Sequence, residues 1–182
     1  MRNLYAVIPS CCRREELTNL VNVLVSDNVT VVVVDTGYEE PLWESGGWWG
    51  KRNVVLDHEQ PKNISRWWNR GLDTVAQAAT WHPADDYVVA VLNDDIIVRP
   101  GFVPALADAI FRHDVAAAAP DVWGWVNERV YTDPVGAPMP GFAFALRGSK
   151  NLRADESLVW WYGDNDLSWQ AMQAGGLVTV PG

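Results

Sequence analysis

Apolar residues form four short runs that predict β-strands, at residues 4–8, 29–34, 53–56 and 87–92. The runs are continuous instead of alternating with polar residues, which is typical of strands covered on both faces. Apolar residues between the runs recur every three or four positions and predict helices at 17–24, 65–79 and 102–110. Strands that alternate with helices predict an α/β domain, with a mostly parallel central sheet and helices on both faces.

The pattern changes after residue 115. Residues 116–140 mix tryptophan and valine with glycine, proline and aspartate, which predicts short antiparallel strands or loops. Three further elements are expected: a strand at 142–147, a helix from 163 to about 174 that ends at Gly175, and a last strand at 177–180. Ser65 is the expected N-cap of the helix at 65–79.

Composition narrows the functional classes. The chain has 182 residues, of which 48% are hydrophobic and 20% charged, and we expect one domain over residues 1–182. A net charge of -9 argues against a broad nucleic-acid surface, because such surfaces depend on clustered lysine and arginine. A local positive cluster would suit a small anionic ligand or a solvated face equally well; it comprises Lys51, Arg52, Lys62, Arg66 and Arg70.

No apolar run is long enough to cross a bilayer, and the first residues lack the pattern of a signal peptide. We therefore expect a cytoplasmic protein without a transmembrane segment, whose oligomeric state the sequence does not predict. The adjacent cysteines, Cys11 and Cys12, are poorly placed for an ordinary disulfide or a zinc pair. Eleven tryptophans suit core packing as well as stacking on sugars or bases, and those of the aperiodic loop at 38–50 could close over a ligand.

Polar residues follow the predicted strands directly. The run at 29–34 ends in Asp35, and the run at 87–92 ends in Asn93, Asp94 and Asp95. Ligands of open α/β sheets bind beyond the carboxyl ends of the strands, and hard divalent cations prefer oxygen ligands of this kind. Taken alone, Asn93, Asp94 and Asp95 favour a solvated turn over a ligand site. The histidines share no spacing of metal ligands, and only His58 follows a strand on the ligand side.

Several motifs, in order along nearly the whole chain, resemble those of GT-A-fold glycosyltransferases, and of glycosyltransferase family 2 in particular. They are VIPS at 7–10 with REEL at 14–17, VVDTG at 33–37, NISRWWNRG at 63–71, LNDD at 92–95, RPGF at 99–102, GFAFALR at 141–147 and YGDNDL at 162–167. The resemblance implies a GT-A fold with a nucleotide-sugar-binding half at 1–100. It places the acceptor and catalytic half at 101–182.

The resemblance also implies the roles of individual residues. A UDP- or GDP-sugar donor would be held by Pro9, Ser10, Asp35, Arg66, Asn69, Asn93 and Asp94. A Mn²⁺ or Mg²⁺ ion would be bound by Asp95 and Asp94, because both metals favour all-oxygen sites with phosphate partners. The acceptor, a glycan or another hydroxyl compound, would lie beside Trp161, Tyr162 and Asp166.

Asp164 is the expected general base of an inverting transfer, and retention of configuration stays open. Residues 164–166 also suit a helix start, where aspartate and asparagine are favoured caps. Two departures from the family pattern weaken the metal and base motifs: Asn93 replaces an aspartate and Gly163 replaces a glutamate. A binding module without turnover is therefore an alternative. A nucleotidyltransferase is a third reading, although residues 11–14 are not its glycine-rich loop.

Overall fold

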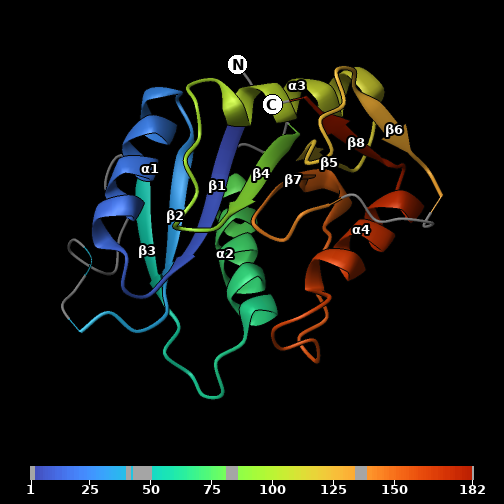
Figure 1. Cartoon of the computed structure of the whole chain (residues 1–182). Helices are drawn as coiled ribbons and strands as arrows, with labels where there is room; N and C mark the ends of the chain where they lie inside the picture. The colour runs from blue at the N-terminus through green and yellow to red at the C-terminus, as the bar shows by residue number, and fades with distance from the viewer. Residues whose placement is uncertain (1–2, 40–41, 43–50, 81–85, 134–138, 182) are drawn as a thin grey trace.

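An eight-stranded mixed sheet runs through the molecule (Figure 1). The structure is a computed structural model, and it describes residues 3–39, 42, 51–80, 86–133 and 139–181. The strand order is β3-β2-β1-β4-β7-β5-β8-β6. The strands are β1 (Asn3–Ser10), β2 (Thr30–Asp35), β3 (Arg52–Leu56), β4 (Tyr87–Leu92), β5 (Ala117–Pro120), β6 (Arg129–Tyr131), β7 (Ala143–Arg147) and β8 (Leu177–Val180).

Parallel pairing joins the strands of the amino-terminal half. β1 pairs in parallel with β2 and with β4, and β2 pairs in parallel with β3. The carboxyl ends of these four strands therefore meet at one edge of the sheet. β7 is antiparallel to β4 and to β5, so its first residues lie at that same edge.

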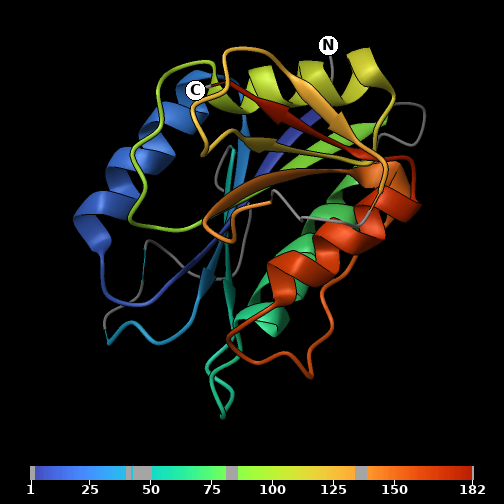
Figure 2. The same cartoon turned by 45° about the vertical axis from the view of Figure 1, so that its right-hand side comes forward.

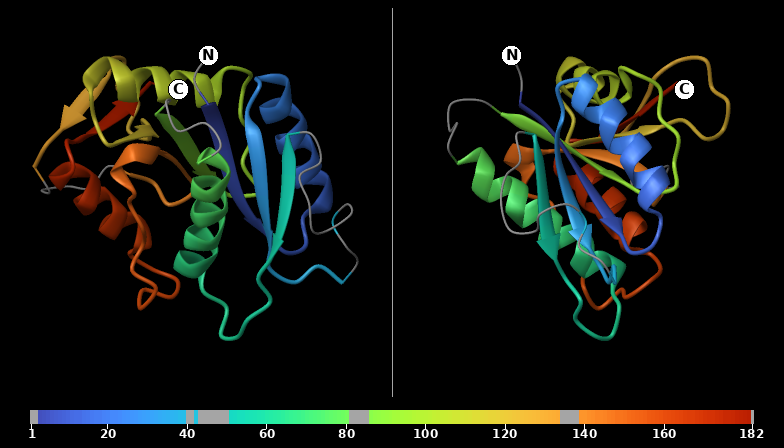
Figure 3. Two further views of the ribbon diagram at one scale, coloured as in Figure 1. Left: turned by 180° about the vertical axis from the view of Figure 1, so that it is seen from behind. Right: turned by 90° about the vertical axis from the view of Figure 1, so that its left-hand side faces the viewer.

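Among the described residues, four α-helices cover the two faces of the sheet (Figures 2 and 3). They are α1 (Arg14–Ser26), α2 (Ile64–Ala79), α3 (Phe102–His113) and α4 (Gly163–Gln173). Buried residues of α1 and α3 pack on one face of the sheet, and those of α2 and α4 pack on the other. A short 3-10 helix, η1 (Gly148–Lys150), follows β7. The predicted arrangement of a mostly parallel sheet with helices on both faces is confirmed.

One local prediction is wrong and another is confirmed in part. The N-cap of α2 is Asn63, whose side chain accepts a hydrogen bond from the backbone nitrogen of Arg66 at 3.0 Å. Ser65 lies inside the helix, and its hydroxyl donates to the carbonyl of Leu158 at 2.7 Å. The short antiparallel strands expected in residues 116–140 are present, since β5 is antiparallel to β7 and β6 to β8. The parallel pairing of β5 with β8 was not expected.

The predicted ligand-covering loop lies mostly outside the described residues, as does His82. Along the described parts of the chain, no helix combines the length and hydrophobicity that a membrane span needs.

Candidate functional site

The ends of β1 and β4 are joined by a short side-chain hydrogen bond. The hydroxyl of Ser10 donates to Oδ2 of Asp94 at 2.6 Å, and it lies 2.7 Å from the phenolic oxygen of Tyr38. Ser10 is buried and Asp94 half-buried. Burial raises the pKa of the Asp94 carboxyl, and the hydrogen bond from Ser10 opposes that rise. Asp94 is thus an acid that neighbouring groups hold in place at the carboxyl edge of the sheet.

Asp95 is the exposed member of the pair of acids. Its carboxylate forms an ion pair with the guanidinium of Arg13, in the turn between β1 and α1. Arg13 was not among the predicted site residues, although its place in the short turn after a strand of the expected site was a usable signal. The positive charge of Arg13 partly neutralises the adjacent carboxylates of Asp94 and Asp95.

Asp35, at the end of β2, is almost completely buried. Its Oδ1 accepts from the backbone nitrogens of Gly37 and Tyr38 at 2.9 and 3.0 Å, and it lies 3.0 Å from Nε2 of His58. Ser10 is the partner of Asp35 in the register of β1 and β2. Asp35 and the Ser10–Asp94 pair therefore belong to one edge, and His58 also lies there, as expected from its position after β3.

Arg66 forms a two-pronged ion pair with Asp57, which follows β3. Its Nε and Nη2 donate to the two carboxylate oxygens of Asp57 at 3.2 Å each. A cavity of about 220 Å³ opens beside this pair, and His58, Arg70 and Glu156 are among its lining residues. For the predicted contact with a diphosphate, Arg66 would offer Nη1, since Nε and Nη2 are hydrogen-bonded to Asp57.

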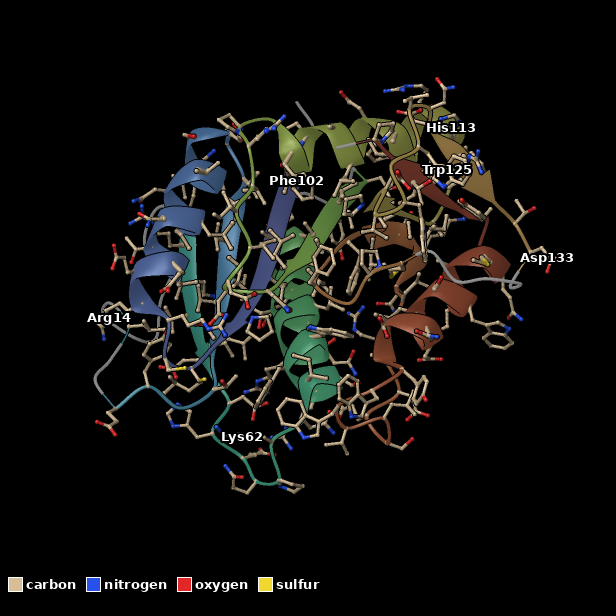
Figure 4. All side chains as sticks on the ribbon, viewed as in Figure 1. Arg14, Lys62, Phe102, His113, Trp125 and Asp133 are labelled. Carbon is tan, nitrogen blue, oxygen red and sulfur yellow. The ribbon has the colours of Figure 1, made fainter. Side chains whose placement is uncertain are left out.

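Lys62 adds positive charge at the end of β1. It belongs to the loop before α2, which Figure 4 shows at the lower end of the molecule. Burial and the neighbouring Cys12 raise the pKa of the Cys11 thiol, while Lys62 acts against that rise, so Lys62 lies close enough to influence the residue next to Ser10. This lysine was identified only as part of a general positive cluster.

Asn69 holds the chain that leads to α4. Its Nδ2 donates to the carbonyl of Ala154 at 2.8 Å and to Glu156 at 3.0 Å, and its Oδ1 accepts from the nitrogen of Ala154 at 2.9 Å. The residue is 8% exposed. Its amide is thus fully used inside the protein, in a position where the family resemblance implied a donor contact.

A backbone hydrogen bond brings the candidate base to the candidate metal acids. The nitrogen of Asn93 donates to the carbonyl of Phe142 at 2.9 Å, just before β7. A Cβ placed on the preceding residue, Gly141, would lie 3.0 Å from a carboxylate oxygen of Asp164. The start of α4 is also packed tightly on α2, since a Cβ on Gly163 would lie 2.8 Å from the hydroxyl of Ser65. Asp164 therefore lies beside the end of β4.

The other predicted acceptor-side residues surround Asp164. Trp161 and Tyr162 are 78% and 68% exposed, and Tyr162 is the N-cap residue of α4 in a left-handed conformation with φ of 69°. Asp166 is engaged within the protein, because its Oδ2 accepts from the nitrogen of Asp155 at 2.9 Å and from Gln170 at 2.8 Å. Pro9 lies within β1 and is buried. The structure thus joins Ser10, Asp35 and Asp94 at one edge of the sheet, whereas the side chains of Asn69 and Asp166 are used in contacts within the protein.

No protein-family model and no curated protein matches this chain. The same fold is found in S. aureus TarS. A crystal structure of TarS residues 1–349 has a TM-score of 0.70 and 13% sequence identity, over 98% of this chain and 58% of the TarS chain. The same fragment in complex with UDP-GlcNAc has a TM-score of 0.66 and 14% identity, over 98% of this chain and 56% of the other. The likeness confirms the predicted fold class, and the chain spans little more than half of the TarS fragment.

The donor set at the end of β4 suits a hard divalent cation with a phosphate partner. Asp94 and Asp95 supply two carboxylates and Asn93 an amide oxygen. Within the described residues, no three His, Cys, Asp or Glu side chains are grouped so as to cage a metal. Mg²⁺ is usually held by one or two carboxylates together with substrate phosphates, so two acids at this edge are sufficient for a cation that arrives with a diphosphate.

Proposed function

We propose that this protein transfers a sugar from a nucleoside-diphosphate sugar to an acceptor hydroxyl, with inversion and with the help of Mn²⁺ or Mg²⁺. The observation that supports the proposal is the hydrogen bond from Asn93 to Phe142, because it joins the residue before Asp94 to the segment whose Gly141 lies against Asp164. The UDP-GlcNAc complex of TarS supports a nucleotide-sugar donor for this fold.

Each acid has a distinct part in the proposed reaction. Asp94 and Asp95 would hold the cation, which neutralises the charge of the leaving diphosphate. Asp35 would accept a hydrogen bond from the nucleobase through Oδ2, since Oδ1 takes the hydrogen bonds that the Asp35 carboxylate accepts from the described residues. Asp164 would remove the proton of the acceptor hydroxyl as this oxygen attacks the anomeric carbon.

The direct test measures nucleoside diphosphate released from a panel of UDP- and GDP-sugars with Mn²⁺, with Mg²⁺ and with a chelator. We expect Asp164→Asn to lower kcat by about 10²–10⁴-fold while nucleotide affinity is kept, as for loss of a general base. Asp95→Asn should lower turnover together with metal affinity. Asp133→Asn is the matched control, because this exposed aspartate lies far from the end of β4 (Figure 4). The anomer of the product, read by NMR, decides between inversion and retention.

A binding module without turnover is the second candidate, favoured by one observation. The carboxylate of Asp95 already forms an ion pair with Arg13, and the neutral side chain of Asn93 contributes no charge to the proposed metal site. This candidate predicts nucleotide binding by calorimetry without any release of nucleoside diphosphate above the level of Asp164→Asn. Release that depends on both Mn²⁺ and Asp164 excludes it.

A further inference from the structure

Four exposed aromatic side chains, which we call the aromatic rim, border the candidate base. Their exposed fractions are 41% for Phe142, 52% for Trp160, 78% for Trp161 and 68% for Tyr162. Exposed groups of large apolar side chains among polar residues mark binding surfaces in soluble proteins. Aromatic side chains offer flat apolar faces at a small cost in conformational entropy.

The rim is held in place before any ligand binds. The hydroxyl of Ser65 donates to the carbonyl of Leu158, which fixes the chain just before the rim to α2. The ring of Trp160 meets that of Trp67 edge to face, with centroids 5.7 Å apart and planes at 83°. Tyr162 adopts a left-handed backbone conformation, which is strained for a residue with a side chain and recurs at functional sites.

The rim approaches Asp164 from two sides. Trp160, Trp161 and Tyr162 precede it directly along the chain, at the start of α4. Phe142 follows Gly141, the residue whose backbone lies against the Asp164 carboxylate. A ring that stacks on the rim therefore presents its substituents to Asp164. This is the geometry that a bound acceptor requires.

The chain segment that carries three of the four rim residues is acidic. Residues 154–170 contain no Lys, Arg or His and four carboxylates: Asp155, Glu156, Asp164 and Asp166. The backbone and hydroxyl of Ser157 donate to Asp155 and lower the pKa of that carboxyl, so it is ionised at neutral pH. Such a surface repels an acceptor that carries phosphate or carboxylate groups, whereas an uncharged sugar ring meets no such barrier.

We propose that the aromatic rim is the acceptor site and that the acceptor is an uncharged saccharide, whose C–H face stacks on Trp161 and its neighbours. The inference rests on the proposed function, because it identifies the hydroxyl compound that Asp164 would activate. It accounts for three consecutive aromatic residues that the fold itself leaves largely uncovered.

The test measures acceptor binding without any donor, by saturation-transfer NMR. The probes are methyl glycosides of glucose, galactose, mannose and N-acetylglucosamine, each beside its 6-phosphate. Trp161→Ala is compared with Trp123→Ala. Trp123 is a matched control because it is also an exposed tryptophan, at 71%. It lies two residues from Trp125, which Figure 4 shows at the opposite end of the molecule from Lys62. Circular dichroism checks that both variants fold.

We expect at least one neutral glycoside to bind through its ring protons. Trp161→Ala should weaken that binding about tenfold, the size of one aromatic contact, and Trp123→Ala should leave it unchanged. The 6-phosphate should bind about tenfold more weakly, by a margin that narrows as salt is raised. Equal effects of the two tryptophan variants, equal binding of the phosphate, or no binding of any neutral glycoside overturns the inference. Failure of the proposed function is a separate result, because it shows as absent nucleotide binding and release.

Discussion

Replacing Asn69 by alanine tests how the acceptor side of the molecule is fixed to α2. The side chain makes three hydrogen bonds, two of them to the backbone nitrogen and carbonyl of Ala154, which is 4% exposed. The alanine variant leaves both backbone groups without a partner. A buried polar group that loses its partner costs about 1–3 kcal/mol, so we expect the free energy of unfolding to fall by about 2–5 kcal/mol.

The measurement is urea unfolding followed by tryptophan fluorescence. The midpoint should fall at an unchanged slope, and the melting temperature should fall by roughly 4–20 °C, at about 2–4 °C per kcal/mol for a chain of this size. Arg70→Ala is the matched control, because Arg70 is the next residue and is exposed, and because its hydrogen bond with Thr74 uses the backbone carbonyl, which alanine keeps. Its effect should stay within about 0.5 kcal/mol.

A second variant separates two roles of Asn69. Asn69→Asp keeps the acceptor for the nitrogen of Ala154 but turns an oxygen toward the carbonyl of Ala154 and the carboxylate of Glu156. We expect it to be at least as destabilising as alanine at pH 7. Nucleotide affinity should be kept in both variants, since the amide is occupied within the protein. Unchanged stability in both variants, or loss of nucleotide affinity at full stability, would refute the positioning role and favour a direct contact with the donor.

Two further predictions concern pH. Burial alone would raise the pKa of the Asp86 carboxyl, but hydrogen bonds from Nε of Arg147, at 2.6 Å, and from Ser149 lower the pKa overall. The ion pair of Asp86 and Arg147 therefore stabilises the fold fully at any pH above the unfolded-state pKa of Asp86. This stabilisation is lost as the pH falls through the lower folded-state pKa. Asp86→Asn should therefore lower the free energy of unfolding by about 1–2 kcal/mol at pH 7 and by progressively less in acid. The measurement is urea unfolding of both proteins between pH 7 and pH 3, and a difference in stability that stays constant over this range contradicts the prediction. Ser10→Ala removes the hydrogen bond that favours the ionised form of Asp94, so the pKa of Asp94 should rise further. The acidic limb of the pH profile of Mn²⁺-dependent nucleotide binding should then move to higher pH. Calorimetric titrations in which the acidic limb of the variant lies at the same pH as that of the unchanged protein rule out this role of Ser10.

The sheet edge was predictable because a local pattern determines it. Continuous apolar runs identified β1, β2 and β4 as central strands, and parallel strands must bring their carboxyl ends together. The convergence of Asp35 and Asp94 follows from those two facts, without knowledge of any contact. The pairing of Arg13 with Asp95 did not follow, because it depends on the path of a turn that the apolar pattern does not describe.

The parallel pairing of β5 with β8 was not predicted, for a different reason. The sequence of β5 is three alanines and a proline, residues with little intrinsic preference for strands. The strand forms because β7 and β8 flank it, and because small side chains fit where both faces of the sheet are covered by helices. Tertiary packing thus overrode local preference at the place where the second half of the sheet is assembled.

Asn69 shows where sequence reasoning about a site stops. The helical period places it off the apolar face of α2, and a polar residue in that position fits a ligand contact or a tether to another segment. The segment that covers it begins 85 residues later, at Ala154, and nothing in the period of α2 indicates that distance. Because the tether also fixes the chain that leads to the aromatic rim and to Asp164, a residue first assigned to the donor is better placed to control the acceptor.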